Sequence, residues 1–333
     1  MRHPRGGRCS AIILSATLLG ITLPRSLPGE TPAEQAEPAA KHRLVYRFRP
    51  GHVLRYESEL RSSMEVRKGE AIQIIDNSTT TNKRLRVVSV GDDGAALVEP
   101  IIERVRMMVQ FDDAQPARFD SASSDPPPRQ FQDVQRKVGR KAARLRIAPH
   151  GELLGITRFD ADGKPIVNKP NELDADGRPV EDQPDEPEFQ ADDNILALLP
   201  AEPVAVGDVW KERFTTRVKV DRKIERSATL QREFVLRKVE GNVATIGVRI
   251  AIITPIADPA ILAQLIQRTP AGRIEFDLER GEIISRTMEQ DQTIYGAIGP
   301  TSSLRAASKL VERRLESEES STERTASTAP PRS

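Results

Sequence analysis

Two copies of an Asp-Ala-Asp-Gly motif come nearest to metal-binding chemistry. They occupy residues 160–163 and 174–177. Neighbouring carboxylates are hard oxygen ligands of the kind that calcium prefers. Neither copy continues into an EF-hand loop with its terminal Glu, and Asp and Gly are also common in ordinary turns. We therefore expect turns at both places, with no metal and no other cofactor.

The histidines and other acidic residues form no pattern for acid–base or nucleophilic catalysis. His52 follows a Pro-Gly turn and His150 lies at a predicted hairpin tip, so both are expected to be exposed. No H-E-x-x-H or G-x-S-x-G motif occurs. Asp120 and Asp125 resemble a carboxylate pair, but without a second acidic pair facing them they fit loop and cap positions better. We expect a protein that is not an enzyme, with a hydrolase as the third alternative.

Small polar residues interrupt the apolar face of two alternating stretches. Ser58 and Ser62 lie on the apolar face of residues 54–66, and Thr216 lies on that of residues 210–220. A filled core normally prefers continuous branched aliphatic side chains. The small polar residues therefore leave room for a cavity, although a shallow sheet with a partly wet face would give the same pattern.

A cavity on the concave face of a curved sheet would suit a lipid-like or other apolar small molecule. Six large side chains on these two faces would line it, although each is equally explained as core: Leu54, Tyr56, Leu60, Met64, Trp210 and Phe214. The alternative function is a structural or protein-interaction module of the cell envelope, which would add a partner's strand to an exposed sheet edge.

Period-two alternation predicts the strands that position these residues. Apolar and polar residues alternate over 54–67 and 210–221, which is typical of strands with one covered face. Strands of the same kind are predicted at 79–90, 95–111, 227–239 and 243–254. Pro100 is expected at an edge or a bulge, because proline has no N–H group for a sheet hydrogen bond.

A helix and a hairpin follow each set of three predicted strands. The helices are expected at 129–138 and after Asp258, which can cap the second one. The hairpins turn at His150-Gly151 and at Arg280-Gly281. Because this order occurs twice, we predict a mainly β (α+β) fold of two similar curved antiparallel sheets, half-barrel-like, each with a short packed helix. The sequence leaves open whether the two units share one sheet.

The first residues predict export. Three arginines precede a short apolar run that ends at Leu23, which is typical of a secretory signal peptide, although a buried strand or helix and an uncleaved anchor are the alternatives. The run is shorter than the roughly 20 residues of a membrane-spanning helix. We expect a protein of the periplasm, cell envelope or extracellular space, with no transmembrane span in the mature chain.

Changes in composition divide the chain into six predicted parts. They are a signal peptide (1–23), a disordered leader (24–41), a first β-rich unit (42–158), an acidic Pro/Gly-rich linker or loop (159–193), a second β-rich unit (194–315) and a disordered tail (316–333). Within the second unit, residues 194–199 fit a short helix or a docking turn. Residues 303–315 fit a strand better than an amphipathic helix.

Overall composition excludes two classes of interaction. The 333 residues include 50 Lys and Arg against 49 Asp and Glu, so no net field attracts nucleic acid. Cys9 is the only cysteine and precedes the apolar run, so the mature chain has no disulfide and no thiol chemistry.

Three segments carry a resemblance to a known group. They are Phe48-Arg49-Pro50-Gly51, Phe119-Asp120-Ser121 followed by three prolines at 126–128, and residues 198–210 with Gly207-Asp208-Val209-Trp210. Together they resemble a family of exported bacterial proteins of unknown function. More distantly, the chain is similar to the half-barrel lipoprotein carriers of the LolA, LolB and LppX type. The resemblance implies a curved antiparallel sheet and no catalytic residues.

Overall fold

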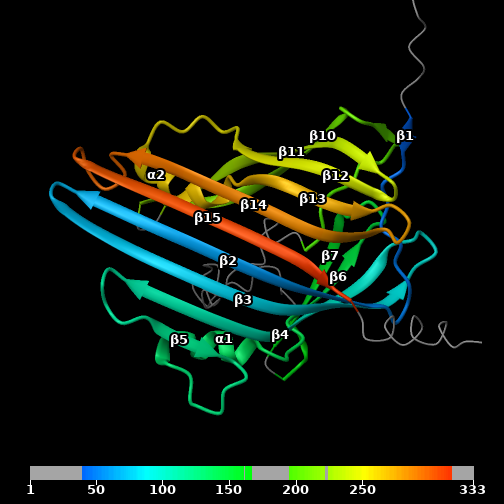
Figure 1. Ribbon diagram of the computed structural model, residues 1–333, viewed down its shortest axis with the longest axis horizontal. Helices are drawn as coiled ribbons and strands as arrows, with labels where there is room; N and C mark the ends of the chain where they lie inside the picture. The colour runs from blue at the N-terminus through cyan, green and yellow to red at the C-terminus, as the bar shows by residue number, and fades with distance from the viewer. Residues whose placement is uncertain (1–39, 161, 167–194, 222–223, 317–333) are drawn as a thin grey trace, which may run out of the picture. The chain divides into compact units, whose positions relative to one another are not determined.

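The computed structural model describes residues 40–160, 162–166, 195–221 and 224–316 (Figure 1). The predicted signal peptide, most of the predicted leader and linker, nearly all of the tail, and the second Asp-Ala-Asp-Gly motif lie outside these residues. At the end of the predicted leader, Lys41 pairs with Ala205.

The described chain consists mainly of antiparallel strands. In the first half they are β1 (Lys41–His42), β2 (Val53–Lys68), β3 (Ala71–Val90), β4 (Ala96–Phe111), β5 (Ala117–Asp120), β6 (Ala143–Ile147), β7 (Leu153–Phe159) and β8 (Pro165–Ile166). In the second half they are β9 (Val204–Ala205), β10 (Val209–Asp221), β11 (Ile224–Glu240), β12 (Val243–Ile252), β13 (Ala271–Asp277), β14 (Glu282–Tyr295) and β15 (Ser302–Leu315). The predicted mainly β fold class is confirmed.

Two short helices lie where the sequence predicts them. The 3-10 turn η1 (Arg129–Phe131) leads into α1 (Gln132–Lys137), and α2 (Pro259–Leu265) continues into the 3-10 turn η3 (Ile266–Arg268). Asp258 caps α2, because its side chain accepts a hydrogen bond from the Ala260 N–H at 2.8 Å. Within the described ranges, no helix is long and apolar enough to cross a membrane.

The two halves of the chain form one continuous sheet. Its strand order is β10-β11-β12-β13-β14-β15-β2-β3-β4-β6-β7-β8, with β5 added beside β4, while β1 and β9 form a separate pair (Figure 1). The last strand of the second half, β15, pairs with the first long strand, β2, from Ser302 opposite Lys68 to Leu315 opposite Arg55. Among the described strands, β8 and β10 each have one neighbour in this sheet, so the sheet is open.

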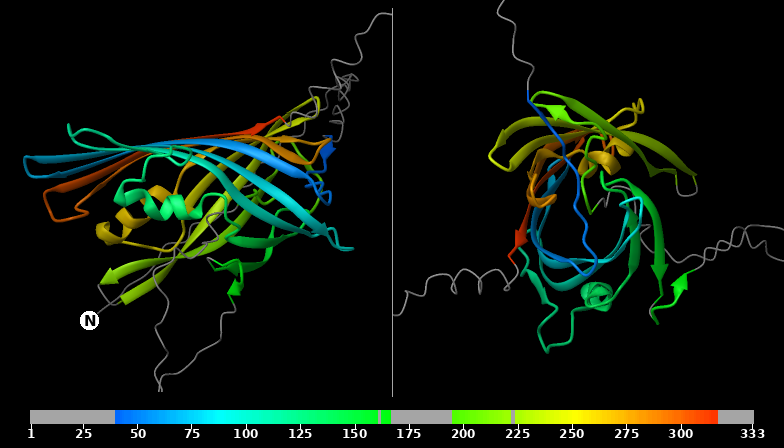
Figure 2. Two further views of the ribbon diagram at one scale, coloured as in Figure 1. Left: turned by 90° about the horizontal axis from the view of Figure 1, so that it is seen from below. Right: turned by 90° about the vertical axis from the view of Figure 1, so that its right-hand side faces the viewer.

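The sheet is strongly curved. Leu145 on β6 and Phe234 on β11 belong to the same buried cluster, although eight strand-to-strand steps separate β6 from β11. At about 4.8 Å per step a flat sheet would hold these strands about 38 Å apart. The sheet therefore bends so that one face, called the inner face here, surrounds the core, and the views in Figure 2 show this bend.

The segment around Tyr46 and residues 195–199 lie outside the long strands and fill one end of the inner face. The Tyr46 N–H donates to the Pro149 carbonyl at 2.8 Å, and the Leu199 N–H donates to the His150 carbonyl at 2.7 Å. The Tyr46 hydroxyl donates to the Ala197 carbonyl at 2.9 Å, and burial raises the pKa of this hydroxyl well above its usual range. Residues 195–199 are thus a docking segment, and their described backbone forms no helix.

The helices cover the inner face elsewhere. Phe131, at the end of η1, stacks on Phe119 of β5 with ring centroids 5.4 Å apart. Leu265 of α2 packs with Phe214 and Leu230. The Gln264 side chain also bonds both backbone polar groups of Lys219, at 2.9 Å and 2.7 Å, and so closes part of the β10 edge.

Strand boundaries differ from the predictions mainly in β3. It begins at Ala71, whereas the predicted strand begins at residue 79. Burial does not alternate over residues 71–78, so this part of the strand has no clearly covered face that a period-two pattern would mark. Residues 303–315 form a strand, as predicted. Pro100 lies between the part of β4 that pairs with β6 and the part that pairs with β5, where its missing N–H group costs no hydrogen bond.

Candidate functional site

Three rows of side chains cross the inner face of β14, β15 and β2. Strand register and alternation place Arg286, Glu312 and Ser58 in the first row. Met288, Leu310 and Leu60 form the second row, and Gln290, Ser308 and Ser62 form the third. The face therefore changes from charged to apolar to neutral polar along the strands.

A cavity of about 240 Å³ lies over the apolar row. Leu60, Met288 and Leu310 come from the three central strands, and Leu196 comes from the docking segment. Phe234, Val248, Ile250 and Ile274 add an apolar wall, and Gln267 and Pro270 contribute from the segment that follows α2. We call this space the inner-face cavity.

Two arginines line the inner-face cavity, and no carboxylate does so among the described residues. Arg232 is buried, donates to Glu212 Oε2 at 2.6 Å and lies over the Phe214 ring at 4.9 Å. Burial lowers the pKa of Arg232, partly offset by Glu212, and the positive charge of Arg286 lowers it further. Register places Arg286 level with Ile274 on one side of the apolar row, and Arg232 level with Ile250 on the other side. The cavity is therefore apolar, with an arginine on either side of its apolar row.

Glu312 connects Arg286 to a second cation. Its side chain is 5% exposed, contacts the Lys83 ammonium, and lies 4.0 Å from Arg286 Nε. Arg286 also donates from Nη2 to the Ile195 carbonyl at 3.3 Å, while its buried Nε has no hydrogen-bond partner among the described residues. One carboxylate thus serves two cations.

A separate ionic cluster corrects the predicted exposure of His52. Its side chain is 33% exposed, and its Nδ1 lies 3.6 Å from a carboxylate oxygen of buried Glu282, which also pairs with Arg314. His150 is likewise half-buried instead of exposed, with Nε2 3.0 Å from Glu152 Oε2. Neither histidine lies beside a nucleophile in the contacts of the described chain.

The six predicted lining residues lie at different depths of the inner face. Leu54 and Tyr56 are buried in the main core, and Phe214 is buried beneath α2. Trp210 stacks on Phe234 with centroids 5.5 Å apart, while its Nε1 donates to the Leu198 carbonyl at 2.8 Å. Leu60 lines the inner-face cavity, and half-buried Met64 lies further along β2, opposite Ala306.

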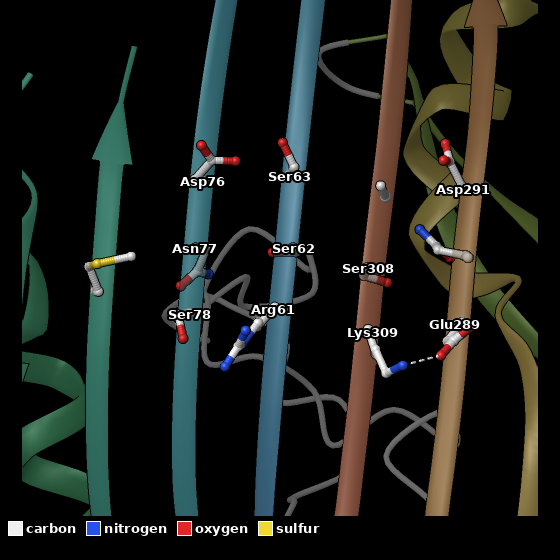
Figure 3. A pocket seen from close by; sticks show the side chains of 13 residues that line it. Arg61, Ser62, Ser63, Asp76, Asn77, Ser78, Glu289, Asp291, Ser308 and Lys309 are labelled. Atoms are coloured by element: carbon white, nitrogen blue, oxygen red, sulfur yellow. Dashed lines mark ion pairs between the residues drawn. The ribbon is translucent and has the colours of Figure 1, made fainter. Parts of the chain in front are cut away.

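A larger open hollow, of about 950 Å³, has a different character (Figure 3). Its lining comes from β14, β15, β2, β3 and β4 and is mostly charged or hydroxylic, with Lys309 and Glu289 paired at 2.7 Å. Buried Gln290 also lines it, and neither polar atom of its amide has a partner in the described part of the chain. This charged and hydroxylic lining suits water better than an apolar ligand.

The carboxylates considered for chemistry have local partners. Asp120 accepts two hydrogen bonds from Arg104, at 3.0 Å and 2.5 Å, and Asp125 accepts one from the Ser123 hydroxyl. Asp160 accepts bonds from the backbone of Asp162 and Lys164, which forms the predicted turn. The described residues contain no group of three or more His, Cys, Asp or Glu side chains that could hold a metal ion.

The Asp120 pair predicts a pH dependence of stability. Hydrogen bonding to Arg104 lowers the pKa of Asp120 to about 2, from about 3.9 in an unfolded chain. Asp120 therefore adds stability above about pH 4, and this contribution is lost as the pH falls towards 2. We expect it to be below about 1 kcal/mol, because the pair is half-exposed.

Urea unfolding of the wild type and of Asp120→Asn at pH 6 and pH 2 measures this contribution. The difference between the two proteins should shrink at the lower pH, and it should also be small in an Arg104→Met background. A difference that is independent of pH in both backgrounds would contradict the assignment.

The predicted lining residues did not include the two arginines of the cavity, Arg232 and Arg286. Arg286 and Gln290 alternate along β14 with Ser285, Thr287 and Glu289, so both faces of this strand are polar. Arg232 likewise lies between Gln231 and Glu233. The apolar neighbours at 230, 234 and 236 are the signal that places Arg232 on the covered face.

Comparisons with known proteins give no functional assignment. No protein-family model and no curated protein matches the chain, so the resemblance to exported bacterial proteins stays a prediction. DynF from the dynemicin biosynthesis pathway of Micromonospora chersina aligns with 89% of this chain and 95% of its own, at 7% identity and a TM-score of 0.21. A DUF1329 family protein from Desulfovibrio piger aligns with 78% of this chain and 84% of its own, at 8% identity and a TM-score of 0.13. With TM-scores this low, neither likeness supports a conclusion about fold or function.

Proposed function

We propose that this protein is exported and binds a lipid-like or other apolar ligand on the inner face of its sheet, without transforming it. The observation that carries the proposal is the inner-face cavity of about 240 Å³, lined mainly by apolar side chains from both halves of the chain. Ligand sites are typically concave and mostly apolar, with a few polar groups that orient the ligand. The arginine-rich start and short apolar run support export.

The local structure of the catalytic candidates supports binding over catalysis. Asp120 and Asp125 are held by Arg104 and Ser123, and neither lines the inner-face cavity. In the cavity itself, the polar side chains are two arginines, Gln267 and Ser308. None of these is a usual general base at neutral pH, so the site is better suited to holding a ligand than to proton transfer.

Native mass spectrometry of protein purified from its own host should reveal a co-purifying apolar molecule. In binding assays with an apolar fluorescent probe, Leu60→Trp should weaken binding by about tenfold or more, because the larger ring fills cavity space. Leu154→Trp is the matched control, since Leu154 is 45% exposed on β7 and does not line the cavity. A clean protein mass together with no probe response would count against the proposal.

A protein-interaction module is the second candidate, supported by the edge of β10. This strand pairs only with β11 among the described strands, although Gln264 occupies the backbone groups of Lys219. An exposed edge can accept a partner's strand. This candidate predicts self-association or capture of an envelope protein, with no bound small molecule.

A further inference from the structure

We propose that the ligand is an anionic amphiphile whose head group is bound by Arg286 and whose apolar chain lies against Leu60, Met288 and Leu310. This inference rests on the proposed function and narrows its ligand class. It predicts which end of the ligand lies at which end of the inner-face cavity.

The charge balance around Arg286 supports an anionic partner. Glu312 is the one carboxylate within 4.0 Å of Arg286 among the described residues, and Glu312 contacts Lys83 more closely. Glu212 faces Arg232 and Glu282 faces Arg314, so each of those acids already has its own cation. Among these described groups, one half-buried positive charge has no carboxylate of its own.

An unbalanced buried charge is costly, because it has lost water without gaining a full partner. The Arg286 side chain is 17% exposed, and its buried Nε makes no hydrogen bond with the described chain. A carboxylate or phosphate oxygen would supply that bond and the missing negative charge. Guanidinium groups suit such anions because their donors are planar and can bind two oxygens at once.

The rest of the cavity favours an apolar chain over a polar anion. Met288 lies two residues along β14 from Arg286, and register places it beside Leu310 and then Leu60. The 240 Å³ volume equals about eight water molecules at about 30 Å³ each, which is room for one short chain and not for a bulky group. A single-chain molecule would fit with its anionic head at Arg286 and its chain along Met288, Leu310 and Leu60.

Calorimetric titration of the full-length protein with decanoate, decyl phosphate, decanol and decyltrimethylammonium, all below their micelle concentrations, tests the head-group preference. Both anions should bind about tenfold more tightly than decanol, and the cation should bind most weakly. Stronger binding of decanoate would favour a free fatty carboxylate as the natural ligand, and stronger binding of decyl phosphate would favour a phosphate lipid. Equal binding of all four probes would overturn the inference.

Substitution of Arg286 assigns the preference to a residue. Arg286→Met should lower the affinity for decanoate to that for decanol, while Arg286→Lys should retain part of the preference because it keeps the charge. Arg313→Met is the matched control, since Arg313 is exposed on β15 and alternation places it on the opposite face. If Arg286→Met does not fold, the wild-type preference among the four probes still decides the inference.

The two proposals fail in different ways. If no probe binds, decanol included, the proposed apolar site is wrong. If decanol binds but the anions bind no better, or if Arg286→Met keeps the full preference for decanoate, the apolar site stands and the arginine head-group site is wrong.

Discussion

Alanine at Gly151 should destabilise the protein by about 3 kcal/mol or more. Gly151 has a φ of +89°, and a Cβ atom there would lie 2.3 Å from the Ala197 carbonyl oxygen and 2.9 Å from Tyr46 Cε2. The left-handed backbone costs about 1–2 kcal/mol for a residue with a Cβ, and forced repacking adds about 1–3 kcal/mol. The same carbonyl accepts the Tyr46 hydroxyl, so the clash also disturbs a buried hydrogen bond.

Gly281 should behave in the same way, because it occupies the matching hairpin of the second half. Its φ is +66°, and a Cβ atom would lie 2.5 Å from Arg47 N and 2.6 Å from the Val45 carbonyl oxygen. Gly69 provides a control, since its φ of +59° is similar but no atom lies within 4 Å of its Cβ position. Urea unfolding of the three alanine variants separates backbone strain from steric clash, and equal losses for all three would refute the packing role.

These glycines illustrate which parts of the fold can be predicted from sequence. Alternation and the Gly-containing turns predict both hairpins, because a hairpin depends on residues close together in the chain. Their second role, in which the two tips hold the chain around Tyr46, depends on contacts between Tyr46 and Pro149 and between Arg47 and Gly281. No local pattern records contacts at such sequence separations.

The pairing of β15 with β2, which joins the two halves, also could not be predicted from the sequence. Both β2 and β15 are predicted strands, but their pairing connects residues near the two ends of the described chain, such as Ser62 and Ser308. Many strands of similar pattern could have occupied either place. Only the common core, which packs both halves with the segments around Tyr46 and Leu199, selects the observed order.

The residues of the candidate site could be predicted only on strands that have one clearly apolar face. Leu60, Ser58 and Ser62 were placed on one face because β2 has a clear apolar face. Arg286 and Glu312 lie on strands whose two faces are both polar, so alternation could not decide which side faces inward. Glu312 pairs with Lys83 and Arg286 on other strands, and such pairs can be predicted only when the register of the strands is known.

Replacing Glu312 with Gln should cost about 3 kcal/mol or more. The change keeps the shape of the side chain but leaves Lys83 and Arg286 on the inner face without the carboxylate they share. Removing one partner of a buried ionic group typically costs about 3–5 kcal/mol, because the remaining charge stays desolvated and unpaired. Glu289→Gln is the matched control on the neighbouring strand, since its pair with Lys309 is more than half exposed and should contribute little to stability.

A second substitution tests whether charge, and not shape, causes the loss. Adding Lys83→Met to Glu312→Gln removes one of the two uncompensated cations, so the double variant should be more stable than Glu312→Gln alone. If Arg286 binds an anionic head group, decanoate should also raise the unfolding midpoint of Glu312→Gln more than that of the wild type, because the ligand supplies the missing negative charge. Equal stability of Glu312→Gln and Glu289→Gln in urea would show that the buried carboxylate does not balance these cations.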